Sequence, residues 1–399
     1  MITPIVKTRF CLRNILIFLY LGAFSGWSFA DALDHWTAAN IVSNFPNPYG
    51  VFFTGLTYGN SHYVGIGQYA SAEMSFAQTS SDGMNWSKSS FSPLMNLSDV
   101  AFNDGTFVAV GGFGVANIWH SDDGNTWTGV TSDMGFSRVI TGGNLFVAVG
   151  GGQTNRQIFT SPDGITWTSR TSGSPITDVH PIPDVAYGAG LFVAVDAAQH
   201  FYTSSGGLTW TRRTNSYFAG RVNFANGLFI APVSAGSNLL SSDGISWGLA
   251  TNNTAAIFKR IIYVAGYYLA ISDTNLFTSV DATNWVKRNL QLPATAALMT
   301  VTAGERNAIV AGYRLSGLGT SPIAFLSDPF VELTSGRTPP VQLTLSGVIS
   351  RSYRIEYITD LPSSGWLTAT TFVLSNSPVF WTDNQATNLA RSYRAVLLP

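Results

Sequence analysis

Short apolar runs recur along the chain at an interval of about forty residues, and each run follows a glycine or asparagine turn. Clear copies are Asn103–Gly111, Gly143–Gly150, Gly190–Val195 and Gly227–Ala231, with weaker copies at Gly266–Ile271, Asn60–Gly65 and Asn307–Gly312. Runs of four to six β-branched and aromatic residues between turn signals are typical of buried strands. The pattern therefore predicts seven units, each containing a buried strand that begins after a tight turn.

A second motif, Ser-x-Asp-Gly-x-x-Trp, recurs in phase with the first. Its copies are Ser80–Trp86, Ser121–Trp127, Ser161–Trp167, Ser204–Trp210, Ser241–Trp247 and Ser279–Trp285, with Gly206 replacing the Asp and Ala282 replacing the Gly. Successive tryptophans are 41, 40, 43, 37 and 38 residues apart. Two turns per unit divide forty residues into four short strands, which is the organisation of a propeller blade. The sequence thus predicts an all-β, seven-bladed β-propeller.

The motif resembles the Asp-box (BNR) repeat, in a form one residue shorter than usual, over roughly residues 36–330. Propellers of this type include sialidases, some glucanases, sortilin-type receptors and the photosystem II assembly factor family, so the resemblance is informative about architecture and not about function. We expect structural roles for Asp82, Asp123, Asp163, Asp243 and Asp281 and for Trp86, Trp127, Trp167, Trp210, Trp247 and Trp285. The carboxylates are expected to cap turns and the indoles to pack on the neighbouring blade. The alternative, calcium ligands or catalytic acids, is disfavoured because one carboxylate per blade forms no cluster.

The two ends of the repeat region complement each other. Trp36-Thr37 resembles the end of a motif copy that has no beginning, whereas the seventh unit, Ile323–Phe330, lacks the Trp. We therefore expect the N-terminal strand to complete the last blade. The predicted propeller covers residues 31–330 and is followed by a linker at 331–340. Residues 341–399 are expected to form a small β-sandwich-like domain that resembles the C-terminal modules of secreted multidomain bacterial proteins.

The first thirty residues are typical of a secretory signal peptide. Lys7, Arg9 and Arg13 precede an apolar run from Ile15 to Phe24, and small residues follow near Ala30. The alternative, an uncleaved anchor, is disfavoured because a membrane-spanning helix needs about 20 apolar residues. The single cysteine, Cys11, lies inside this segment. We therefore expect a secreted, periplasmic or cell-surface protein of a bacterium.

Composition limits the possible chemistry. The net charge is −1 and charged residues make up only 11% of the chain, so there is no basic surface of the kind that binds nucleic acid. The five histidines, at positions 35, 62, 120, 180 and 200, show no metal-ligand spacing. No phosphate loop or nucleophile elbow follows a predicted strand. We therefore predict neither a metal nor a cofactor.

One charged constellation emerges when the seven units are aligned on their first strands. The residue that precedes the apolar part of this strand is Gly55, Asp99, Arg138, Asp184, Arg221, Arg260 or Thr300. Since the first strand is the innermost of each blade, these residues should surround the propeller axis on one face. Either the three arginines pair with Asp99 and Asp184, or they bind an anionic ligand, since guanidinium groups bind carboxylates and sulfates bidentately.

The function predicted from these features is a non-catalytic binding or assembly module for a protein or an envelope polysaccharide. The alternative is a sialidase-like glycoside hydrolase, in which three arginines would hold a sialic acid carboxylate beside a Tyr–Glu pair and an acidic Asp. Beyond the leader the chain has only four glutamates, at positions 73, 305, 332 and 356, and it lacks the Phe-Arg-Ile-Pro segment of sialidases, Phe45-Pro46 being the nearest match. A Glu and Tyr beside the arginines would distinguish the enzyme from the binding module.

Overall fold

The computed structural model describes residue 33, most of the chain from 36 to 327 and the strands of the C-terminal region. Its gaps are residues 43–49, 70–73, 90, 92–95, 113–116, 131–134, 152–156, 171–179, 214–218, 235, 306 and 317–318, and from 328 on only 332–335, 341–346, 352–358, 367–373, 375, 379–384 and 392–397 are described. The expected signal peptide at 1–30 lies outside the described residues.

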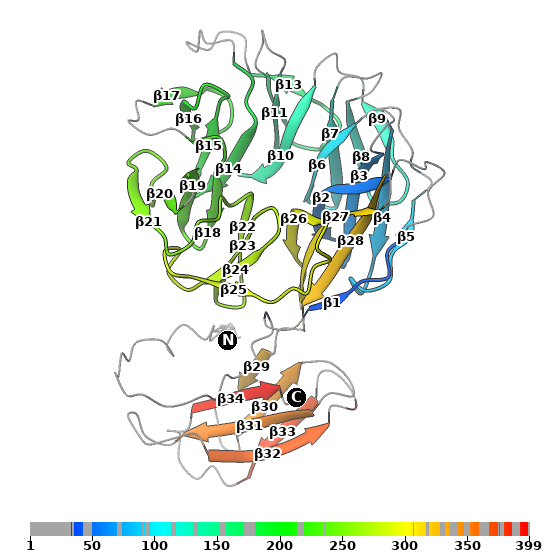
Figure 1. Ribbon diagram of the computed structural model, residues 1–399, viewed down its shortest axis with the longest axis vertical. Helices are drawn as coiled ribbons and strands as arrows, with labels where there is room; N and C mark the ends of the chain where they lie inside the picture. The colour runs from blue at the N-terminus through cyan, green and yellow to red at the C-terminus, as the bar shows by residue number, and fades with distance from the viewer. Residues whose placement is uncertain are drawn as a thin grey trace, which may run out of the picture. The chain divides into compact units, whose positions relative to one another are not determined.

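Seven four-stranded antiparallel sheets form a ring around a common axis (Figure 1). Blade one contains β2 (Val51–Gly59), β3 (His62–Tyr69), β4 (Ser75–Ser80) and β5 (Ser87–Lys88), and blade two contains β6 (Leu97–Asn103), β7 (Thr106–Gly111), β8 (Ile118–Ser121) and β9 (Thr128–Val130). Blade three contains β10 (Phe136–Gly142), β11 (Leu145–Gly150), β12 (Gln157–Ser161) and β13 (Thr168–Ser169), and blade four β14 (Asp184–Gly188), β15 (Leu191–Val195), β16 (Phe201–Ser204) and β17 (Thr211–Arg213). Blade five contains β18 (Asn223–Ala225), β19 (Leu228–Ser234), β20 (Ser237–Ser241) and β21 (Gly248–Thr251), and blade six β22 (Arg260–Val264), β23 (Tyr267–Ile271), β24 (Leu276–Ser279) and β25 (Trp285–Arg288). Blade seven contains β26 (Ala296–Ala303), β27 (Ala308–Ser316), β28 (Gly319–Ser327) and β1 (Trp36–Ala38).

The predicted all-β, seven-bladed propeller is therefore confirmed, and the described residues include no helix. In particular, no described helix is long and apolar enough to cross a membrane.

The core of the propeller lies between the blades. Each motif tryptophan packs in a cluster shared by its own blade and the preceding one, as Trp210 does with Val147 and Ile158 of blade three. The other clusters repeat this arrangement for Trp86, Trp127, Trp167, Trp247 and Trp285. The expectation that the indoles pack on neighbouring blades is confirmed. Burial of these apolar layers is the main source of cohesion between blades.

The first described strand closes the ring. Strand β1 is the outermost strand of blade seven and pairs with β28, which confirms the predicted closure. The segment then continues to blade one, where the Asn40 amide nitrogen donates to the Met84 carbonyl (2.7 Å) and the Trp86 amide to the Asn40 carbonyl (3.0 Å). The buried Gln78 side chain bonds both backbone groups of Val42. One short segment therefore ties the last blade to the first.

The C-terminal region forms two three-stranded antiparallel sheets. One contains β29 (Glu332–Ser335), β30 (Val341–Ser346) and β33 (Val379–Asp383), and the other β32 (Leu367–Val373), β31 (Ser352–Ile358) and β34 (Ser392–Leu397). Strand β29 corrects the sequence interpretation, because it lies in the stretch 331–340 that was expected to be a linker and pairs with β30 from Glu332 to Ser335. Leu343 and Ile355 are buried between the sheets. The chain divides into two compact units, Trp36–Leu326 and a second one that contains Ser327–Pro399.

Candidate functional site: an arginine cluster at the propeller axis

The inner strands place the aligned residues at one register. Asp99 lies opposite Val110, Arg138 opposite Val149, Asp184 opposite Val195 and Arg260 opposite Ile271, in each case next to the end of the second strand. Gly55 and Thr300 occupy the same register, and Arg221 lies two residues before β18. In blades one, two, three and seven the pairing shifts just before this position, which is how β-bulges redirect a side chain. We call the side of the ring where the inner strands begin the arginine face.

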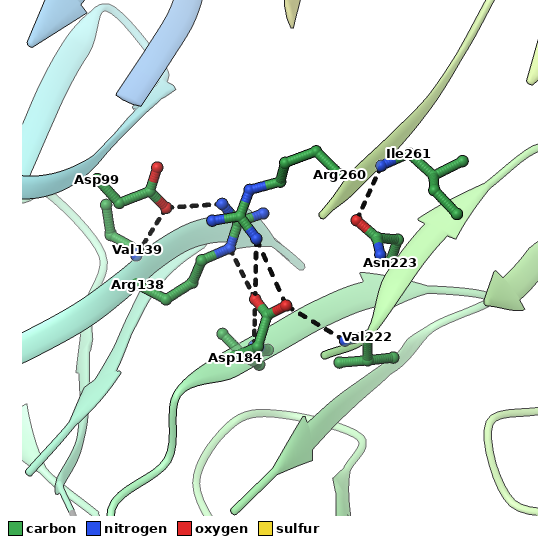
Figure 2. A network of polar contacts seen from close by, with 9 residues as sticks. Asp99, Arg138, Val139, Asp184, Val222, Asn223, Arg260 and Ile261 are labelled. Carbon is green, nitrogen blue, oxygen red and sulfur yellow. Dashed lines mark hydrogen bonds and ion pairs between the residues drawn. The ribbon is translucent and has the colours of Figure 1, made fainter. Parts of the chain in front are cut away.

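Arg138 links two carboxylates that come from different blades. Its Nη1 donates to Asp99 Oδ2 at 2.9 Å, and its Nε lies 3.0 Å from Asp184 Oδ1 (Figure 2). Both carboxylates are buried, and the Arg138 side chain is 18% exposed. Burial favours a lower pKa for Arg138, but the charges of Asp99 and Asp184 outweigh it and raise the pKa above its ordinary value. The two carboxylates thus keep Arg138 positively charged despite its burial.

The same carboxylates also bond the backbone of the next blade. Asp99 Oδ2 accepts from the Val139 amide and Asp184 Oδ2 from the Val222 amide, both at 3.2 Å. Between blades five and six, Asn223 Oδ1 accepts from the Ile261 amide at 3.0 Å (Figure 2). The inner strands are therefore joined by side-chain-to-backbone bonds, and much of the acceptor capacity of the two aspartates is already used.

Arg260 is compensated less well than Arg138. Its Nη1 lies 3.4 Å from both oxygens of Asp184, which is long for a charge-assisted bond, although its side chain is only 15% exposed. Burial, reinforced by the charge of Arg138, lowers the pKa of Arg260 to about 10, and the attraction of Asp184 does not offset this. The positive charge of Arg221 also repels that of Arg260 and lowers the pKa of Arg260 further.

Arg221 is exposed, and among the described residues no hydrogen bond or ion pair involves its side chain. The interpretation that all three arginines pair with the aspartates is therefore correct for Arg138, weakly so for Arg260 and wrong for Arg221. The pairing partner of an arginine depends on the reach of its side chain across the axis, which the repeat does not encode. The role of Asn223 was missed, although a polar residue at a position where blades two, three, four and six have alanine or isoleucine was a usable signal.

The Ser-x-Asp-Gly turns lie at the opposite end of the blades and form separate caps. In each of the five turns that contain Asp, one carboxylate oxygen accepts two backbone amides and the Ser hydroxyl, as Asp243 Oδ1 does from Ile245, Ser246 and Ser241. The same contacts recur at Asp82, Asp123, Asp163 and Asp281. The amides of Ser246 and Ile245 lower the pKa of Asp243 to about 2. Among the described residues no group of three potential metal ligands occurs.

Charge is divided between the two ends of the blades. The turns at the end opposite the arginine face, which we call the turn face, contain no described lysine or arginine and contain Asp82, Asp104, Asp122, Asp123, Asp163, Asp243, Asp281 and Glu305. At the arginine end of the strands lie Arg138, Arg170, Arg213, Arg221, Lys259, Arg260, Arg288 and Arg314, with Asp99, Asp184, Asp196 and Asp273 as the described acids. Over the described residues, the propeller therefore has an acidic and a basic face. Glu305 lies on the acidic one, away from the arginines.

Comparisons with known proteins give the fold but no family. No protein-family model and no curated protein sequence matches the chain. Among solved structures, YCF48 from Cyanidioschyzon merolae is similar with 14% identity and a TM-score of 0.54, covering 73% of this chain and 98% of its own. A structure described as YCF48 bound to D1 peptide has 15% identity and a TM-score of 0.55, covering 76% and 99%. The WD40 propeller of Doa1 has 9% identity and a TM-score of 0.50, covering 72% and 96%. At these identities the likeness establishes a β-propeller of this kind.

Proposed function

We propose that this protein is an exported, non-catalytic binding module whose arginine face engages an acidic segment of a protein partner. The observation that carries the proposal is the division of charge, with the cations named above at the arginine end of the blades and with Arg221 there lacking an ion-pair partner among the described residues. A face of one sign attracts and orients partners of the other sign. A propeller of similar fold is described as bound to a peptide, which supports a protein partner for this chain too.

The assignment of the repeats to the Asp-box type belongs to the same proposal. It is supported by the turn geometry, in which the aspartate caps its own hairpin and each motif tryptophan packs between blades. Aspartates of this kind contribute to stability and leave recognition to the other face.

The proposal of export rests on the composition of residues 1–30. The intact mass of protein recovered from the periplasm or medium is expected to match a chain that begins near Asp31. Recovery of only the full-length chain from membranes would contradict it.

Binding arrays test the choice of partner. The purified protein is applied to acidic, neutral and basic peptides and to a glycan array, at low and at high salt. We expect binding to acidic peptides that weakens as salt screens the arginine face. Binding confined to glycans would replace the protein partner by an envelope polysaccharide. Turnover of fluorogenic sialosides or other glycosides would contradict the non-catalytic assignment.

A further inference from the structure

The charges near the axis do not balance. Three guanidinium groups, those of Arg138, Arg221 and Arg260, face two carboxylates, those of Asp99 and Asp184. Arg138 lies closest to both carboxylates, at 2.9 and 3.0 Å. The cluster therefore retains one positive charge that its own residues do not neutralise.

The uncompensated charge is located on one side of the cluster. Arg260 reaches only Asp184, at 3.4 Å and through a single nitrogen, so most of its five N–H donors have no described partner. Arg221 has no described ion pair, and its charge repels that of Arg260. Two guanidinium groups of neighbouring blades that repel each other are stabilised by an anion placed between them.

A third donor belongs to the same two blades. Asn223 follows Arg221 by two residues and accepts from the amide of Ile261, the residue next to Arg260. Its Nδ2 is buried and has no partner among the described residues. A buried amide donor without a partner costs free energy, so the junction between these two blades is not fully hydrogen-bonded by the described residues.

We propose that Arg221 and Arg260 form a binding site for one carboxylate group. The planar guanidinium groups match the two oxygens of a carboxylate, and Arg260 is partly shielded from water, which strengthens such a contact. The carboxylate comes either from an acidic residue or chain terminus of the partner or from a small free acid. The first source deepens the proposed function and rests on it, whereas the second does not need it.

The test measures the binding of an acidic peptide and of free succinate by calorimetry at constant ionic strength. The variants are Arg221→Gln and Arg260→Gln, and Lys287→Gln is the control because Lys287 is an exposed cation on the outermost strand of blade six and is not among the cations of the arginine face. We expect each site variant to weaken binding roughly tenfold or more and the control to change it little. Arg221 is exposed, so its substitution leaves the fold intact, as circular dichroism should confirm.

The outcomes separate the site from the function. Peptide binding that survives in both site variants, or that falls equally in Lys287→Gln, overturns the site and leaves the proposed function standing. Succinate binding that depends on Arg221 without any peptide binding supports the site and contradicts the proposed function. If neither the peptide nor succinate binds, the carboxylate site and the proposed function are both contradicted.

Discussion

At the scale of single residues, the turn of blade four shows what the missing aspartate does. Gly206 occupies the Asp position, and the Ser204 hydroxyl is buried without a partner among the described residues. In the other turns the Ser hydroxyl donates to the aspartate at 2.9 to 3.0 Å. Nothing lies within 4 Å of the position that a side chain at Gly206 would occupy.

Gly206→Asp is therefore expected to stabilise the protein by about 1 kcal/mol, because it supplies the acceptor that Ser204 lacks. Denaturant unfolding measures the change, with Gly206→Ala as the control for lost backbone freedom. An aspartate variant no more stable than the alanine variant would show that the turn does not adopt the geometry of the other blades.

The aspartates of the Ser-x-Asp-Gly turns make the stability of the propeller sensitive to acid. Backbone amides lower the pKa of Asp243 to about 2, whereas an aspartate in the unfolded chain has a pKa of about 3.9. A lowered pKa in the folded state gives stability that is fully present above about pH 4 and is lost as pH falls towards 2. We expect stability to decline over this range and to decline less steeply in Asp243→Asn. If the free energy of unfolding falls equally steeply with pH in both proteins, Asp243 does not contribute to the acid sensitivity.

At the scale of elements, the N-terminal segment replaces the covalent connection that joins other blades. The Ala39 amide donates to the Ala324 carbonyl of blade seven at 2.9 Å, and Val42 bonds the Gln78 side chain of blade one. Deleting residues 31–42 should expose the edge of β28 and lower the melting temperature or cause aggregation. Gln78→Ala, which removes only the contact with blade one, should cost about 1–3 kcal/mol. A deletion variant that melts like the intact chain would mean that the ring does not depend on this segment.

The elements also show which features a repeat can reveal. The forty-residue period predicted the blades and the register of Asp99, Arg138, Asp184 and Arg260, because a repeat fixes equivalent positions in equivalent strands. It could not reveal which arginine reaches which carboxylate, since those contacts join side chains of different blades. Strand β29 was missed because Glu332–Ser335 is short and lies outside the period.

At the scale of the whole molecule, the Arg138 network joins three consecutive blades and extends to a fourth that does not follow them directly in sequence. Arg138 of blade three contacts Asp99 of blade two and Asp184 of blade four, and Arg260 of blade six adds a longer contact. Arg138→Met should destabilise the protein by about 3–5 kcal/mol, because it leaves two buried carboxylates without their strongest partner.

The double variant Arg138→Met, Asp184→Asn separates charge from packing. If unpaired charge causes the loss, removing one carboxylate should recover part of it, and unfolding free energies of the single and double variants give the coupling. Additive effects of the two substitutions would refute a direct interaction.

Ring closure by β1 has a consequence for the order in which the protein folds. Each of the first six blades consists of one contiguous segment, so it can form as soon as its own forty residues are available. Blade seven cannot, because its outer strand is the first to be synthesised and its other three are the last. The two ends of a loop of nearly three hundred residues must meet, and the entropy of that encounter makes it the slow, late event of folding. A chain halted before β28 would therefore keep an open ring with an unpaired N-terminal strand.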